Sequence, residues 1–129
     1  MKSPQAPVTI LLVDDAEDCL ATLDVALQTM PGVVVRSAHS AEAALEVLAR
    51  DEVSAVITDI HLPAMTGLEL ISRIRQEPRL HTLPVLVVSA DADPGAARTA
   101  LDSGANAFFG KPFSPGAVRK KLEELIHAS

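Results

Sequence analysis

Short apolar runs alternate with apolar residues at helical spacing, and this alternation occurs five times along the 129 residues. Four of the runs are rich in valine, isoleucine and leucine and lie at residues 8–13, 33–35, 53–58 and 83–88. The fifth, at residues 107–109, is the short run Ala107-Phe108-Phe109. After each run, apolar residues recur three or four positions apart, which is the period of one helix face. Continuous rather than alternating apolar runs indicate strands that are buried on both faces, as in a parallel sheet between two helical layers. The pattern therefore predicts an α/β fold with a doubly wound sheet of five parallel strands.

Capping residues predict where several of the helices begin and end. Thr66 and Glu69 are three residues apart, which fits a capping box at the start of the third helix. Asp93 before Pro94 predicts a fourth helix that has a capping carboxylate and proline as its first residue. The remaining signals are Ser40 and Ser114 as N-caps, and Pro31–Gly32 and Gly104 as stops.

Composition excludes several classes of function. Hydrophobic residues make up 48% of the chain but aromatic residues only 2%, which argues against a stacking platform for single-stranded nucleic acid. The net charge of -6 disfavours direct binding to nucleic acid phosphates. Cys19 is the single cysteine, so a disulfide framework within the chain is excluded. Its place beside the first helical stripe predicts a small core residue rather than a reactive thiol.

The chain shows no targeting or membrane signal. No apolar run approaches the roughly 20 residues that a membrane span needs. Residues 1–7 are a short polar lead and not a signal peptide, and they are expected to be disordered. We therefore expect a soluble, cytoplasmic protein with one domain over residues 8–127 and no membrane partner.

Polar residues stand where four of the five predicted strands end. Asp14 and Asp15 follow the first strand, Asp59 the third, Ser89 the fourth and Lys111 the fifth. Taken singly, each has an ordinary explanation: a helix cap for Asp15, a turn for Asp59, a loop hydroxyl for Ser89 and a solvated lysine for Lys111. The carboxyl ends of parallel strands meet at one edge of the sheet, where ligands of such folds bind. The joint pattern therefore predicts one site.

The charges of this predicted site call for a cation. Two carboxylates within about 4 Å repel by roughly 4 kcal/mol at an effective dielectric of 20. Mg²⁺ suits a site rich in hard oxygen ligands and commonly shares its shell with phosphoryl oxygens, while Lys111 adds a further positive charge. One carboxylate could then attack phosphorus and form an aspartyl phosphate. The residues themselves thus favour phosphoryl chemistry.

The set Asp14-Asp15, Asp59, Ser89-Ala90 and Lys111-Pro112-Phe113 resembles the receiver domain of two-component response regulators, of the chemotaxis type with a single domain. The loop from Asp59 to Gly67 is similar to that family in its proline, methionine and glycine, although Thr66 replaces the usual Asp or Asn. The likeness extends over residues 8–127 and implies a flavodoxin-like fold with strand order 2-1-3-4-5.

The resemblance also implies a role for each site residue. Asp59 would accept a phosphoryl group from a histidine kinase or a histidine phosphotransfer protein. Mg²⁺ would be held by the side chains of Asp14, Asp15 and Asp59 and by the backbone carbonyl of His61. Ser89 would bond the phosphoryl group in the active state, Lys111 would pair with it, and the peptide bond before Pro112 would be cis. His61 and Asp91 stand where the family tunes the lifetime of the phosphoryl group.

An output mechanism follows from the same resemblance. Phe108 occupies the position of an aromatic switch residue that moves inward with Ser89; the alternative is that Phe108 is only a core residue. The surface that changes would be the fourth helix, fifth strand and fifth helix, at about residues 94–127, which also mediates dimers in the family. The downstream protein or output domain is left open.

Three other functions compete with this switch. A haloacid-dehalogenase-type phosphatase also forms an aspartyl phosphate. Its motif after the first strand is Asp-x-Asp, however, whereas this chain has Asp14-Asp15. A flavin carrier needs a Ser/Thr-rich phosphate loop and flanking aromatic residues, and neither is present. A receiver that is never phosphorylated is disfavoured by the intact acidic set. We therefore expect a binding module that modifies only itself, not an enzyme acting on a separate substrate.

Overall fold

Five strands and five helices alternate along the part of the chain that the computed structural model describes, residues 8–90 and 93–127. In chain order they are β1 (Val8–Val13), α1 (Glu17–Leu27), β2 (Val33–Ala38), α2 (Ala41–Arg50), β3 (Ala55–Thr58), α3 (Gly67–Gln76), β4 (Val85–Ser89), α4 (Ala96–Asp102), β5 (Ala107–Gly110) and α5 (Pro115–His127). The strands form one parallel sheet in the order β2-β1-β3-β4-β5. This confirms the predicted doubly wound α/β fold and the flavodoxin-like strand order.

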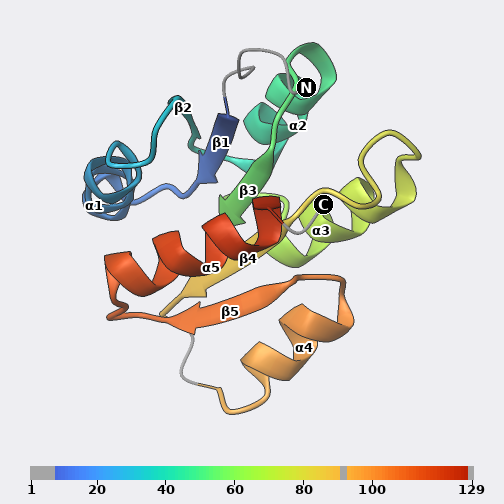
Figure 1. Cartoon of the computed structure of the whole chain (residues 1–129). Coiled ribbons are helices and arrows are strands. Elements are labelled where there is room, and N and C mark those ends of the chain that lie inside the picture. The colour runs from blue at the N-terminus through green and yellow to red at the C-terminus, as the bar shows by residue number, and fades with distance from the viewer. Residues whose placement is uncertain (1–7, 91–92, 128–129) are drawn as a thin grey trace.

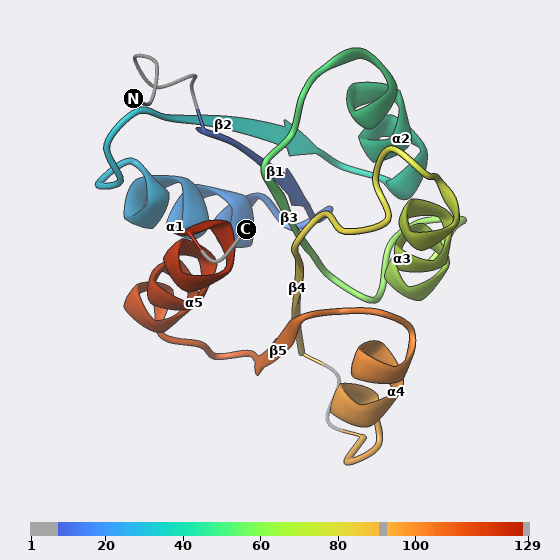
Figure 2. The same ribbon diagram turned by 45° about the vertical axis from the view of Figure 1, so that its right-hand side comes forward.

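The helices form one layer on each face of the sheet (Figures 1 and 2). Helices α1 and α5 cover one face, where Leu23 and Leu122 belong to a cluster with Ile10. Helices α2, α3 and α4 cover the other, where Leu48 and Ile71 are buried in a second cluster. The sheet is therefore the shared wall of two aliphatic cores, as continuous apolar strands require.

The predicted caps of three helices are present. The Ser40 hydroxyl accepts a hydrogen bond from the amide of Ala43 at 3.1 Å. Thr66 and Glu69 form the predicted capping box, with reciprocal bonds of 3.1 and 3.0 Å. At α5, the Ser114 hydroxyl accepts from the third residue along at 3.2 Å. These bonds satisfy amides that have no partner inside the first turn of a helix.

Several boundaries differ from the predicted ranges, among them the start of β3, at Ala55 and not at residue 53. Two of the differences have local reasons. Strand β4 begins at Val85 and not at residue 83 because Pro84 has no amide hydrogen to donate to the ladder. Helix α4 begins at Ala96 and not at Pro94, and it has no side-chain N-cap bond. The Asp93 carboxylate instead accepts from the amide of Gly95 at 2.9 Å, which closes a turn before the helix.

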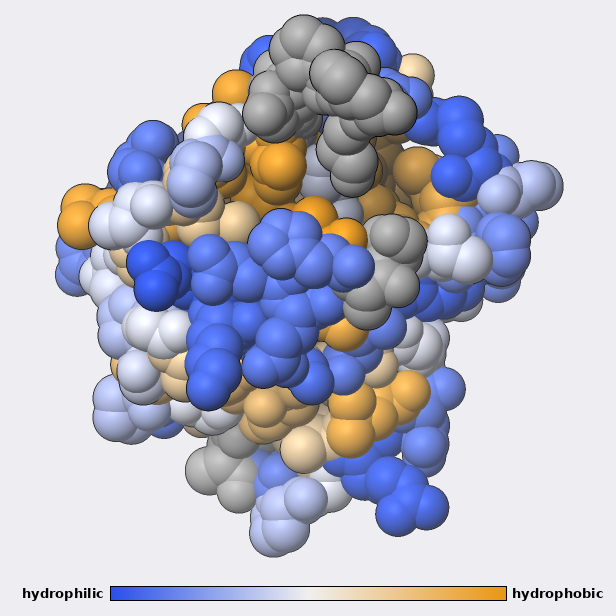
Figure 3. Space-filling view, in the orientation of Figure 1, coloured by the Kyte–Doolittle hydropathy of each residue, from blue (hydrophilic) through white to orange (hydrophobic). Residues whose placement is uncertain are grey.

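The outer surface of α5 is polar, as expected for a helix that packs on a sheet along one side. Val118 and Leu122 are buried against the sheet, whereas Lys120 and Glu124 are exposed. Figure 3 shows a hydrophilic band over this helix. Within residues 8–90 and 93–127, every helix is too short or too polar to cross a bilayer.

Candidate functional site

Backbone hydrogen bonds fix the carboxyl edge of the sheet on which the candidate site is built. The amide of Asp59 donates to the carbonyl of Val13 at 3.0 Å, which continues the pairing of β3 with β1 beyond the last strand residue. In the same way, the Lys111 amide donates to the carbonyl of Ser89 at 2.8 Å. The ladder therefore places an aspartate, a lysine and a serine from separate chain segments at one end of the sheet.

One ammonium group joins two buried carboxylates at this edge. The Nζ atom of Lys111 lies 3.1 Å from Oδ2 of Asp14 and 3.1 Å from Oδ2 of Asp59. The two aspartates are only 3% and 8% exposed. Burial opposes the charge of Lys111, but its hydrogen bonds to both carboxylates outweigh that effect and raise its pKa above the ordinary value. Lys111 is therefore a fixed positive charge that offsets one of two buried negative charges.

Loop amides hold the second oxygen of each carboxylate. Oδ1 of Asp14 accepts from the amide of Ala16 at 2.9 Å, and Oδ1 of Asp59 accepts from the amide of His61 at 3.2 Å. Each carboxylate thus has one oxygen on a loop amide and the other on Lys111. Bonds of this kind fix both the position and the rotation of the two groups.

The structure brings together some of the other predicted residues but not all. Asp15 is exposed, although it follows the buried Asp14 directly, and the side chain of His61 is exposed as well. Ser89 is fully buried at the end of β4. Phe108 is half-buried and packs on the core beneath α2, α3 and α4, and the peptide bond between Lys111 and Pro112 is cis. Asp91 lies outside the described residues, as does the lead at 1–7.

The loop after Asp59 depends on a glycine whose role the sequence did not show. A Cβ atom on Gly67 would lie 2.0 Å from the carbonyl oxygen of Asp59, where no side chain can fit. The same carbonyl accepts a hydrogen bond of 2.9 Å from the hydroxyl of Thr58, and the amide of Gly67 donates to Ile60 at 2.7 Å. The start of α3 is therefore packed directly on the backbone of the candidate acceptor residue.

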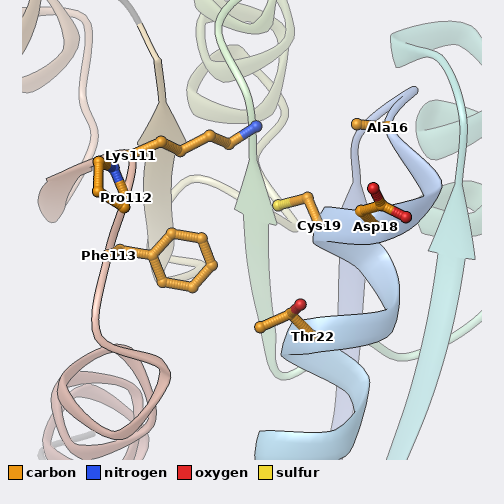
Figure 4. A pocket seen from close by; sticks show the side chains of 7 residues that line it. All are labelled: Ala16, Asp18, Cys19, Thr22, Lys111, Pro112 and Phe113. Atoms are coloured by element: carbon orange, nitrogen blue, oxygen red, sulfur yellow. The ribbon is translucent and has the colours of Figure 1, made fainter.

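A pocket of about 360 Å³ opens beside Lys111, between α1 and the segment after β5. Figure 4 shows Lys111 extending towards α1 and the Cys19 sulfur atom pointing into the same pocket, to the right of the Phe113 ring. Burial raises the pKa of the Cys19 thiol to about 12, helped by a hydrogen bond to Asp14 and its charge. Cys19 also packs on the core beneath α1, as predicted. Its contact with Asp14 was not predicted, although its place in the first turn of the following helix was a signal.

The donor atoms at this edge fit a magnesium ion. They are carboxylate oxygens, the hard ligands that Mg²⁺ prefers, and Asp14 and Asp59 carry one negative charge more than Lys111 offsets. Among the residues described, no three Asp, Glu, His or Cys side chains are already arranged to hold a metal. The sequence predicted a cluster of three carboxylates. In the structure two of them, Asp14 and Asp59, are buried together, and the third, Asp15, is exposed.

Comparisons with known proteins agree with this fold. Residues 10–123 match the response regulator receiver domain family. A chemotaxis protein CheY homolog from Campylobacter jejuni is 30% identical over 118 residues, 91% of each chain. A protein assigned as a response regulator from Chloroflexus aurantiacus has a TM-score of 0.88 at 34% identity, covering 95% of this chain and 99% of its own. The same fold occurs in the receiver domain of a sensor histidine kinase from Pseudomonas aeruginosa PAO1, with a TM-score of 0.84 at 24% identity over 95% of this chain and 99% of that one. The structure of that domain has a magnesium ion coordinated in its active site cleft.

Proposed function

The chain belongs to the response regulator receiver domain family, and from this membership we propose that Asp59 is the phosphoryl acceptor of a two-component signalling switch. Lys111 supports this proposal most directly, because its ammonium holds Asp59 and Asp14 together at 3.1 Å each. The domain would extend over residues 8–127 and work in the cytoplasm, where receivers of this type typically act. Its phosphodonor would be a histidine kinase or a histidine phosphotransfer protein.

In the proposed reaction an Asp59 oxygen attacks the phosphorus of the donor's phosphohistidine. An O–P bond forms, the N–P bond breaks, and the imidazole leaves with the electron pair of that bond. Lys111 would stabilise the charge on the transferred group, because its ammonium already lies beside the acceptor oxygen. The amide of His61 holds the other oxygen of Asp59 at 3.2 Å and thereby orients the nucleophile. The chain would modify only itself, which distinguishes it from an enzyme acting on a separate substrate.

Magnesium would be held by the carboxylates of Asp14, Asp15 and Asp59 and by the backbone carbonyl of His61. When bound, the ion would offset negative charge on the phosphoryl oxygens. Asp14 supports this assignment because it is buried at the site and already fixed by Ala16 and Lys111. Asp15 is exposed and would complete the set of ligands from the same loop.

In the proposed switch, Ser89 and Phe108 would carry the conformational effect of phosphorylation from Asp59 to the output surface. A hydrogen bond from the Ser89 hydroxyl to a charged phosphoryl group would contribute about 1.5–3 kcal/mol, which shifts a two-state equilibrium by roughly 10- to 150-fold. Phe108 has no hydroxyl, so its coupling would act through packing on the core that it already contacts. The responding surface would be α4, β5 and α5. It would bind an output partner or a second copy of the chain, and His61 and Asp91 would set the phosphoryl lifetime.

Phosphorylation by a small donor tests the acceptor assignment. The chain is incubated with acetyl phosphate and Mg²⁺, and its intact mass is measured. We expect a gain of one phosphoryl group that is lost in Asp59→Asn and kept in Asp102→Asn, which changes an exposed aspartate on α4. An unchanged gain in Asp59→Asn would exclude Asp59 as the acceptor. Steady turnover of a phosphorylated metabolite would instead favour a phosphatase.

A further inference from the structure

The guanidinium group of Arg75 forms a cluster of hydrogen bonds at the opposite end of α3 from the candidate site. Nε and Nη2 donate to the carbonyl of Gly104 at 3.0 and 2.8 Å. Nη1 donates to the carbonyls of Leu83 and His81 at 2.7 and 3.2 Å, and Nη2 also reaches Oδ1 of Asn106 at 3.1 Å. All five N–H donors of the group are thus used. Every acceptor is a neutral oxygen, so the contacts hold backbone rather than balance charge.

These acceptors belong to two segments that are far apart in the sequence. One is the approach to β4, which contains His81 and Leu83, and the other is the turn between α4 and β5 (Figure 2). Asn106 links them directly: its Oδ1, which accepts from Arg75, also accepts from the amide of Val85 at 2.8 Å, and its own amide donates to the Val85 carbonyl at 2.7 Å. Arg75 therefore fixes the turn after α4 to α3 and to the segment before β4, and Asn106 fixes it to the start of β4.

The local geometry leaves little room for that turn to move. Gly104 has a φ of +117°, and a Cβ atom there would lie 2.9 Å from Cγ of Arg75. The amide of Ala105 donates back to the carbonyl of Ala100, in the last turn of α4, at 3.0 Å. The fixed turn is therefore continuous with the C-terminal end of the helix.

The N-terminal end of α4 is held differently. Its N-cap residue is Gly95, which has no side chain with which to cap the helix. The carboxylate and carbonyl of Asp93 accept from the amides of Gly95 and Ala96, both at 2.9 Å, and these bonds close a turn within the same segment. This is also the end of the helix that follows Ser89 along the chain.

We propose that Arg75 is a positioning residue that anchors the C-terminal end of α4, so that α4 responds to the site by pivoting about this anchor. A movement that begins at Ser89 is then taken up at residues 93–99, while residues 104–106 stay in place. The pivot rests on the proposed function for the origin of the movement. The anchor itself does not, and it exists in the unphosphorylated chain.

Residue-resolved amide hydrogen exchange of the full chain tests the anchor. Arg75→Met removes the donors but keeps an unbranched side chain, and Arg73→Met is the matched control on an exposed position of the same helix. We expect exchange at Val85 and Asn106 to rise at least tenfold in Arg75→Met and to stay unchanged in Arg73→Met. Arg75→Lys, which keeps the charge but not the planar fork, should give a smaller rise and serves if Arg75→Met fails to fold. An equal rise in all strands would mean general destabilisation and would overturn the anchor.

The pivot is tested by adding acetyl phosphate and Mg²⁺, with the mass of the chain followed in parallel. In the unsubstituted chain we expect exchange to change several-fold at residues 96–99 and less than twofold at residues 104–106. In Arg75→Met both segments should respond. Equal responses at the two ends of the unsubstituted chain, or none despite a full gain in mass, would overturn the pivot. A chain that never gains the phosphoryl mass would overturn the proposed function together with the pivot, and the unphosphorylated comparison would still decide whether the anchor exists.

Discussion

Lys111 carries the electrostatic balance of the candidate site. Its ammonium is the group that contacts both Asp14 and Asp59, and the side chains of these two aspartates are only 5% and 10% exposed. Removing one partner of a buried ion pair leaves a charge without compensation, which costs far more than the pair itself contributes. The same removal makes the site more negative and should strengthen its attraction for a divalent cation.

Lys111→Met should lower the free energy of unfolding in magnesium-free buffer by roughly 3 kcal/mol, the lower end of the cost of breaking a buried pair. Added Mg²⁺ should stabilise this variant more than it stabilises the unsubstituted chain, because the cation meets less positive charge. Urea unfolding with and without Mg²⁺ measures both effects. Lys121→Met is the control, since its pair with Glu124 is 3.8 Å long and exposed. If Mg²⁺ stabilised Lys111→Met and the unsubstituted chain by the same amount, Lys111 would not influence the cation site.

Gly67→Ala should be destabilising, because its Cβ atom would meet the carbonyl oxygen of Asp59 at 2.0 Å and the backbone must shift. We expect a loss of about 1–3 kcal/mol, as for other overpacked positions, together with slower phosphorylation by acetyl phosphate. Gly116→Ala is the control in the first turn of α5, where the nearest atom to a new Cβ is 3.9 Å away. That change should stabilise the chain by about 0.4–1 kcal/mol through the unfolded state. Equal effects of the two substitutions would contradict the close approach of α3 to Asp59.

The Cys19 thiol should react slowly while the chain is folded. Burial, and then the hydrogen bond to Asp14, raise its pKa from 9.0 to about 12, so at pH 9 the folded chain holds roughly a thousandth of its thiol as thiolate, against half when unfolded. Because the folded pKa is the higher one, the stability that this thiol contributes is complete below pH 9 and is lost as the pH rises towards 12. Iodoacetamide labelling at pH 9, followed by mass, should be at least about 100-fold slower in buffer than in urea.

Asp14→Asn provides the control for Cys19. It removes the carboxylate that raises the thiol pKa, so labelling should become several-fold faster in the folded chain and stay unchanged in urea. Labelling at the same rate in both folded chains would mean that Asp14 does not influence Cys19. The control also separates this effect from simple burial, which Asp14→Asn leaves in place.

The residues that meet at the sheet edge could be predicted only where strand order alone brings them together. Asp14, Asp59 and Lys111 follow three parallel strands, and parallel strands end at the same edge. The approach of Gly67 to Asp59 depends on the path of an irregular loop, which no spacing encodes. The burial of Asp14 beside an exposed Asp15 likewise depends on the direction in which the chain turns into α1.

At the scale of helices and strands, apolar period and capping chemistry predicted most of the elements, and the start of α4 shows where they fail. Asp93-Pro94 satisfies the sequence rule for a helix start, yet the helix begins two residues later. Glycine has a high conformational entropy in the unfolded chain, so Gly95 weakens the first turn. The Asp93 carboxylate then closes a turn with the Gly95 amide. The same residues thus fit both a helix start at Pro94 and a turn closed by Asp93, and the sequence alone does not show which is more stable.

Gly95→Ala should strengthen the start of α4. Gly95 already has helical angles, φ -84° and ψ -6°, and a Cβ atom there would meet nothing closer than 3.5 Å. We therefore expect a gain of about 0.4–1 kcal/mol in the free energy of unfolding, with slower amide exchange at residues 96–99. Urea unfolding and residue-resolved exchange measure the two effects. A loss of stability would show that the turn closed by Asp93 needs glycine.

For the whole molecule, the two cores on opposite faces of one sheet set how stability is shared. Ile10 of β1 belongs to the cluster beneath α1 and α5, and Ile71 of α3 to the cluster beneath α2, α3 and α4. Both side chains are fully buried. Because the strands contribute side chains to both clusters, we expect neither core to unfold while the other remains folded. Because the two isoleucines belong to different clusters, their contributions should still be independent.

Ile10→Val and Ile71→Val should each cost about 0.5–1.5 kcal/mol, and the double variant should lose the sum to within about 0.5 kcal/mol. Urea unfolding followed by both far-ultraviolet circular dichroism and amide proton signals gives the free energies and tests for one transition. Conservative substitutions keep the double variant folded, so a departure from additivity can be measured. A double variant that unfolds in two steps would show that the sheet does not couple the two faces. A single transition with a strongly non-additive loss would show instead that strain passes through the sheet from one core to the other.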